Sequence, residues 1–245
     1  ETREVWVREV VDATLDRIAD RDASLRAFTA VLSDSARVDA DRADQEIAAG
    51  RYRGPLHGVP VSIKDLIDIA GVPTTAASRV TGRAPATSDA LVVARLRAAG
   101  AILIGKCNLH EFAFGTTGED SSHGQTLHPR DPNRSPGGSS GGSAVSVATG
   151  MAFATLGTDT GGSIRIPAAA CGLVGLKPTF GEVSCDGVVP LAPSLDHVGP
   201  LTRCVRDARL VYRAIRDHQG SESAPINGAA QTLGCPRPYF LDRLD

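Results

Sequence analysis

The segment Asp159-Thr-Gly-Gly-Ser-Ile-Arg-Ile-Pro167 constrains this chain more than any other. Its two adjacent glycines, Gly161 and Gly162, carry no Cβ, so the backbone can turn tightly there and approach a ligand closely. A serine that leaves such a turn and opens a helix, here Ser163, can have several backbone N–H groups aimed at one point beside its hydroxyl. That arrangement is what an oxyanion hole requires. An ordinary glycine turn with a capping serine explains this one segment equally well.

A serine becomes a useful nucleophile only when another group takes its proton. None of the six histidines lies in a recognisable catalytic pattern. The run Gly137-Gly-Ser-Ser-Gly141 matches a nucleophile elbow, but the residues before it, 130–136, do not read as the strand that this motif needs. Lys64, directly after a predicted strand over 59–63, is the remaining base if burial keeps it neutral, although a single lysine taken alone is better explained as a surface charge. Ser139, in its glycine-lined loop, is placed to relay the proton.

Composition excludes several classes of function. The 245 residues include 26 basic and 28 acidic side chains, so the formal net charge of -2 gives no sign of a nucleic-acid partner. No apolar run reaches the ~18 residues of a membrane span. Five scattered cysteines without Cys-x-x-Cys spacing indicate reduced thiols and a cytoplasmic protein. His110-Glu111 begins like a zinc motif, but Phe114 replaces the second histidine, so we expect no metal.

Periodicity predicts an α/β protein. Apolar residues recur at helical spacing over 3–19 and 89–99, and the second of these stretches ends at Gly100. A buried strand is predicted over 101–104, with a turn at Gly105. The run Pro136–Gly142 leads directly into a small-residue helix, so we interpret it as an ordered loop. No linker is evident, and we expect a single domain over residues 1–245.

Three blocks of this sequence resemble the hallmark motifs of the amidase signature family. They are Gly58-Val-Pro-Val-Ser-Ile-Lys-Asp65, Gly137-Gly-Ser-Ser-Gly-Gly-Ser-Ala144 and Gly157-Thr-Asp-Thr-Gly-Gly-Ser-Ile-Arg-Ile-Pro167. Ser139 follows Lys64 by 75 positions and precedes Ser163 by 24, and both spacings are similar to those of the family. Further stretches resemble it outside these blocks, including Ser194-Leu-Asp-His-Val-Gly-Pro200.

The resemblance implies a mixed twisted β-sheet flanked by helices on both faces, and a Ser–cis-Ser–Lys triad. Ser163 would form an acyl-enzyme with a small-molecule amide, while Ser139, on a cis peptide, would pass protons to a neutral Lys64. No metal and no organic cofactor would take part. The backbone N–H groups of Thr160, Gly161 and Gly162 would bind the oxyanion. Asp159 and Arg165 would support the nucleophile loop.

The resemblance also implies a continuation. Gly234–Asp245 resembles the point at which family members enter another strand–helix unit, so we expect the C-terminal part of the family domain to be absent from this chain. The missing part could be a separate chain, and the protein could also form a homo-oligomer. Ile166 stands where we expect glutamine in amidotransferase A subunits that act on misacylated tRNA, which favours the stand-alone amidases. An amidotransferase subunit and a non-catalytic fragment remain the alternatives.

Overall fold

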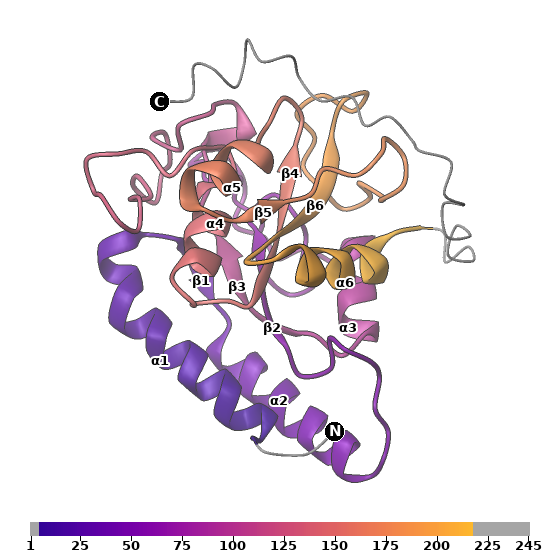
Figure 1. Ribbon diagram of the computed structural model, residues 1–245. Coiled ribbons are helices and arrows are strands. Elements are labelled where there is room, and N and C mark those ends of the chain that lie inside the picture. Colours follow the sequence, from indigo (N-terminus) through magenta and orange to yellow (C-terminus); the bar gives the residue numbers. More distant parts are fainter. Residues whose placement is uncertain (1–4, 218–245) are drawn as a thin grey trace, which may run out of the picture.

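The computed structural model describes residues 5–217 of the chain, and these residues share one six-stranded sheet. Helices and strands alternate along much of the chain, and Figure 1 shows the helices packed around the sheet. The elements in chain order are α1 (Val7–Leu25), β1 (Phe28–Val31), α2 (Ser33–Ala48), β2 (Pro60–Lys64), α3 (Leu91–Ala98), β3 (Ile102–Cys107), the 3₁₀ turn η1 (Glu111–Ala113), α4 (Gly141–Ala148), β4 (Ala154–Asp159), α5 (Arg165–Cys171), β5 (Val174–Gly175), β6 (His197–Thr202) and α6 (Val205–Ile215).

The sheet has the strand order β1-β3-β2-β4-β6-β5. The three central strands β3, β2 and β4 are parallel, and the strands outside them pair antiparallel. Parallel strands bring their carboxyl ends to one edge of a sheet, so the residues that end β2 and β4, Lys64 and Asp159, lie at the same edge. The mixed sheet that the resemblance implied is confirmed.

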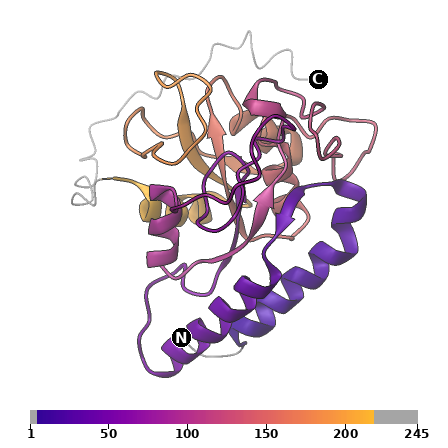
Figure 2. The same cartoon turned by 180° about the vertical axis from the view of Figure 1, so that it is seen from behind.

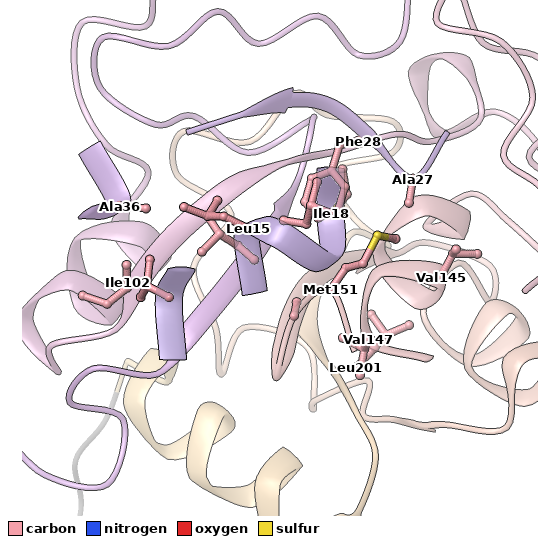
Figure 3. Packing of buried hydrophobic residues seen from close by; sticks show 14 of the residues in the cluster. Leu15, Ile18, Ala27, Phe28, Ala36, Ile102, Val145, Val147, Met151 and Leu201 are labelled. Carbon is pink, nitrogen blue, oxygen red and sulfur yellow. The ribbon is translucent and has the colours of Figure 1, made fainter. Parts of the chain in front are cut away.

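Helices cover both faces of this sheet. On one face α1, α2, α4 and α5 enclose an apolar cluster that includes Leu15, Ile18 and Met151, with which Val145 and Leu201 also pack (Figure 3). On the other face α3 and α6 pack over the alternate side chains of the central strands. Figure 2 shows α1 and α2 side by side along the lower edge of the molecule. Each central strand is therefore buried on both sides, and every residue of β2, β3 and β4 is buried.

The prediction of a turn at Gly105 is wrong, because β3 runs through this residue to Cys107. The glycine allows a close approach instead. A Cβ at position 105 would lie 2.6 Å from the carbonyl oxygen of Ala30, on the neighbouring strand β1. The register between these strands also shifts between Phe28 and Ala30, close to the same point. A missing side chain here signals strand packing, and a turn is only one of the roles that glycine can play.

Residues 5–217 contain no helix that is long and apolar enough to cross a membrane. Cys107 and Cys171 are buried free thiols, and Cys185 and Cys204 are also unpaired. Cys235 and the predicted strand–helix unit at Gly234–Asp245 lie outside the described residues.

Candidate active site

Lys64 ends β2 with its side chain wholly buried. Its Nζ donates hydrogen bonds to Oγ of Ser139, at 2.7 Å, and to Oγ1 of Thr158, at 2.8 Å. Both acceptors are uncharged hydroxyls, and they come from segments 75 and 94 residues further along the chain. The sheet edge thus places the amino group of Lys64 in contact with both the glycine-rich loop and β4.

The environment of Lys64 favours the neutral amine. Burial lowers the pKa of Lys64 to about 7, although the charges of Asp159 and Asp196 act in the opposite direction. No carboxylate within residues 5–217 forms an ion pair with Lys64. The next residue, Asp65, pairs instead with Lys106, whose Nζ lies 3.1 Å from its Oδ1, and both of these side chains are buried. Lys64 can therefore accept a proton near neutral pH, as a general base must.

The run 136–142 leads into α4, whose first residues are Gly141 and Gly142, and Ser139 is fully buried within it. The peptide bond between Gly138 and Ser139 is cis. Gly138 lies so close to the 116–118 backbone that a Cβ would stand 2.8 Å from the nitrogen of Gly118. The carbonyl of Ser139 accepts a hydrogen bond from the N–H of His110 at 3.1 Å. These contacts fix the Ser139 hydroxyl beside Lys64.

The same loop holds the nucleophile loop through Ser140. The N–H of Ser140 donates to the carbonyl of Ser163 at 3.2 Å, and its hydroxyl donates to the carbonyl of Thr158 at 3.2 Å. Ser163 is 7% exposed and so lies just below the surface. Within residues 5–217 its hydroxyl makes no hydrogen bond, not even with Ser139. The expected relay is thus formed from Lys64 to Ser139, while the contact from Ser139 to Ser163 is open.

A buried carboxylate organises the nucleophile loop. Asp159 accepts hydrogen bonds from the N–H groups of Gly162 at 2.9 Å and Ile164 at 3.1 Å. Arg165 closes a two-point ion pair on the same group, with Nη2 to Oδ1 at 2.9 Å and Nε to Oδ2 at 3.0 Å. Burial alone would raise the pKa of Asp159, but the hydrogen bonds from Arg165 and from backbone N–H groups lower it overall. The two residues hold the shape of the loop, which fits the supporting role predicted for them.

The backbone donors of the loop are not equivalent. Gly162, with φ of +137°, directs its N–H to Asp159, so this donor is already engaged. In the described part of the chain the N–H groups of Thr160, Gly161 and Ser163 have no protein acceptor. The N–H of Gly162, which was predicted as an oxyanion donor, is thus engaged by Asp159, while the N–H groups of Thr160, Gly161 and Ser163 are unengaged in the described residues.

Sequence reasoning missed three residues of this site. Thr158 is the second acceptor of the Lys64 amine, but a threonine inside a strand gives no functional signal by itself. Asp196 accepts a hydrogen bond from the Thr160 hydroxyl at 2.5 Å. Lys106 neutralises Asp65 and also donates to the carbonyl of Ile67 at 2.6 Å. The ion pair of Lys106 with Asp65 could not be predicted, because Asp65 follows Lys64 directly in sequence and Lys64 would have been the obvious partner.

Within the described ranges no group of three or more histidine, cysteine or acidic side chains is placed to hold a metal ion. The residues of the site are a lysine, two serines, a threonine and a loop of backbone donors. This set is suited to nucleophilic attack by a hydroxyl with proton transfer to an amine. The fold and the site together thus define a mixed α/β protein with a buried lysine–serine pair beside a glycine-rich loop.

The comparisons with known proteins agree with this class. The family model described as Amidase matches residues 9–234. This chain belongs to the amidase family.

Two groups of relatives share the fold and sequence. Among curated proteins, the glutamyl-tRNA(Gln) amidotransferase subunits A of Anaeromyxobacter sp. (strain K) and Anaeromyxobacter dehalogenans (strain 2CP-C) are 50% and 55% identical, each over 97% of this chain and 51% of the relative. Among solved structures, the native peptide amidase of Stenotrophomonas maltophilia has a TM-score of 0.84 at 43% identity, covering 89% of this chain and 46% of that one. The chain thus spans about half the length of the curated relatives it matches.

Proposed function

We propose that this chain carries the catalytic centre of an amide hydrolase, in which Ser163 attacks the carbonyl carbon of a small-molecule amide. The observation that carries the proposal is the buried Lys64 amine, which donates to Ser139 and Thr158 and pairs with no carboxylate in the described residues. A lysine in this state is costly to bury and serves little structural purpose. Its use as a base explains it.

The reaction would proceed through an ester on Ser163. As the Ser163 oxygen bonds to the carbonyl carbon, its proton passes to Ser139, and the Ser139 proton passes to the Lys64 amine. The carbonyl oxygen becomes an oxyanion beside the free N–H groups of the loop. When the C–N bond breaks, the proton on Lys64 returns by the same path to the leaving nitrogen. Water then attacks the ester by the same sequence and releases the acid.

This path requires the hydroxyls of Ser139 and Ser163 to come into contact. Catalytic hydrogen bonds that are open in a free enzyme often close only when substrate is bound. The Ser163 hydroxyl makes no hydrogen bond within the described residues, so no existing hydrogen bond of this hydroxyl has to break before the contact forms. The buried free thiols Cys107 and Cys171 support a reducing, cytoplasmic setting for the protein.

A partitioning experiment tests the acyl-enzyme. The purified protein is incubated with a panel of amides that share one acyl group, in the presence of hydroxylamine. A common acyl-Ser163 intermediate gives the same ratio of hydroxamate to acid for every member of the panel. Ser163→Ala should abolish both products, while Ser24→Ala, an exposed serine on α1, should change neither. A ratio that varies with the leaving amine, or turnover by Ser163→Ala, contradicts the proposal.

A second candidate function is the glutamine-hydrolysing subunit of an amidotransferase. Curated relatives with 50% and 55% identity are named as such subunits, which favours it. Against it stands Ile166, whose Cδ1 and Cγ2 lie against the glycine turns at Gly162 and Gly137 and make the wall beside the nucleophile loop apolar. Hydrolysis of glutamine that depends on added partner subunits and ATP would favour the amidotransferase. Partner-independent hydrolysis of other amides would favour the stand-alone amidase.

A further inference from the structure

Asp196 lies where two segments of the chain meet at the site. It directly precedes β6, next to His197, whose β4 partner is Asp159. Its carboxylate accepts hydrogen bonds on both oxygens. Oδ1 accepts from the hydroxyl of Thr160 at 2.5 Å, and Oδ2 accepts from the N–H groups of Leu191 at 2.9 Å and Ala192 at 3.0 Å. Asp196 thus ties the 191–196 turn to the loop that carries Ser163.

The same carboxylate shares a cavity with a hydrogen-bond partner of the proposed base. Thr158, Thr160 and Asp196 line one small cavity of about 10 Å³, which has room for about one water molecule. Thr158 is also an acceptor of the Lys64 amine. Asp196 is thus linked to Lys64 through Thr158, in a buried region where a charge is weakly screened.

We propose that Asp196 is a positioning residue of the hydrolase centre, with two separable effects: its hydrogen bonds hold Thr160 and the free N–H groups of the nucleophile loop, and its negative charge acts on the Lys64 site from the cavity that Thr158 also lines. The inference rests on the proposed function. The carboxylate touches neither Lys64 nor Ser163, so it acts through the loop and through its field.

The other ionisable groups around Lys64 leave this effect distinct. Asp159 is neutralised by its two-point pair with Arg165. Cys107, the β3 partner of Lys64, is a neutral thiol, because burial raises its pKa to about 11. The adjacent α4 carries no charged side chain. His197 directs Nδ1 to backbone carbonyls, and its Nε2 lies 3.2 Å from Nζ of Lys177. Of the carboxylates that affect Lys64, Asp196 is thus the one without a basic partner in residues 5–217.

Asp196→Asn isolates the effect of charge. An asparagine oxygen can still accept from Leu191 and Ala192, and its amide can donate to the Thr160 hydroxyl, so the loop keeps its connections. Loss of the negative charge destabilises protonated Lys64. The readout is the rate constant for inactivation by a fluorophosphonate, measured between about pH 6 and pH 9. We expect the acid limb of this profile to move to lower pH by a few tenths of a unit or more.

Thr160→Val isolates the effect of position. It removes the hydroxyl that Asp196 holds and leaves the carboxylate in place. We expect the plateau of the inactivation rate to fall about tenfold or more with the acid limb unmoved, because a loosened loop presents its oxyanion donors less well. A merely structural role for Asp196 would lower the plateau in Asp196→Asn as well and would leave its pH profile in place.

Asp131→Asn is the matched control, because it removes one negative charge from a surface ion pair with Arg134. An acid limb that is unmoved in Asp196→Asn, or moved equally in Asp131→Asn, would overturn the inference. So would a Thr160→Val protein with an unchanged plateau. Failure of the proposed function looks different, since the wild-type protein would then not react with the probe at Ser163 at all.

Discussion

Replacement of Lys64 by methionine should stabilise the fold at neutral pH, and the gain should disappear as pH rises. Methionine keeps an unbranched stem of similar length but carries no charge. In the folded protein the pKa of Lys64 is lowered from 10.5 to about 7 by burial. In the unfolded chain Lys64 stays protonated up to about pH 10.5. Between about pH 7 and pH 10.5 the folded state therefore binds fewer protons than the unfolded state. Stability contributed by the wild-type lysine therefore rises with pH across that window.

The magnitude follows from the two pKa values. Each unit of pKa difference corresponds to about 1.4 kcal/mol. Below pH 7 Lys64 is protonated in both states, and its burial then costs the wild-type fold about 5 kcal/mol. Between about pH 7 and pH 9 the wild-type protein should regain about 2 kcal/mol of this cost. The methionine variant should regain none of it. Burial also lowers the pKa of Lys106 and raises those of Cys107 and Cys171, but these groups are common to both proteins and cancel in the difference.

Urea unfolding of both proteins at several pH values across this window measures the effect. The free energy of unfolding of Lys64→Met should exceed that of the wild type most at the lowest pH, and the difference should shrink steadily toward about pH 9. Lys177→Met, at a half-buried lysine bonded to Pro178 and His197, is a matched control that should show no such trend. A difference between Lys64→Met and wild type that stays constant with pH would refute the reasoning, because Lys64 would then be charged in the folded protein.

Four further predictions follow from the site. Ser139→Ala should reduce turnover by roughly 10²-fold or more yet leave slow acylation of Ser163, measured as a single-turnover burst, since the nucleophile and its donors remain. Gly162→Ala should lower activity and cost about 1–3 kcal/mol in urea unfolding, because φ is +137° and the new Cβ would stand 2.7 Å from Ile166 Cδ1. Asp159→Asn should weaken the Arg165 pair and lower kcat, while KM changes less. Lys106→Met should cost about 3–5 kcal/mol by leaving Asp65 buried and unpaired, and adding Asp65→Asn should restore much of that loss.

The sequence was informative where a residue type has few reasons to occur. Two adjacent glycines before a serine, and a lysine at the end of an apolar strand, drew attention to Ser163 and Lys64; the resemblance added Ser139, and the structure brings Lys64 and Ser139 into contact. The supporting pair of Asp159 and Arg165 was predicted from the resemblance and lies inside the nucleophile loop.

The rest depends on three-dimensional neighbours that no local pattern encodes. Gly105 looked like a turn because a glycine gives the same signal whether it permits a bend or a close approach, and here the carbonyl of Ala30 occupies the space. Lys64 and Lys106 are both buried lysines at the ends of adjacent strands. One meets hydroxyls and the other meets Asp65, so only the packing of other segments decides which is the base.

The identity of the residue that a fluorophosphonate modifies tests the central claim most directly. The protein is treated with a fluorophosphonate near pH 8, digested, and mapped by mass spectrometry. Our account predicts one adduct, on the peptide that contains Ser163, formed at a rate that rises with pH through about 7 as Lys64 loses its proton, and absent from Ser163→Ala. An adduct on any other residue, or a rate that does not change across this range, would contradict it.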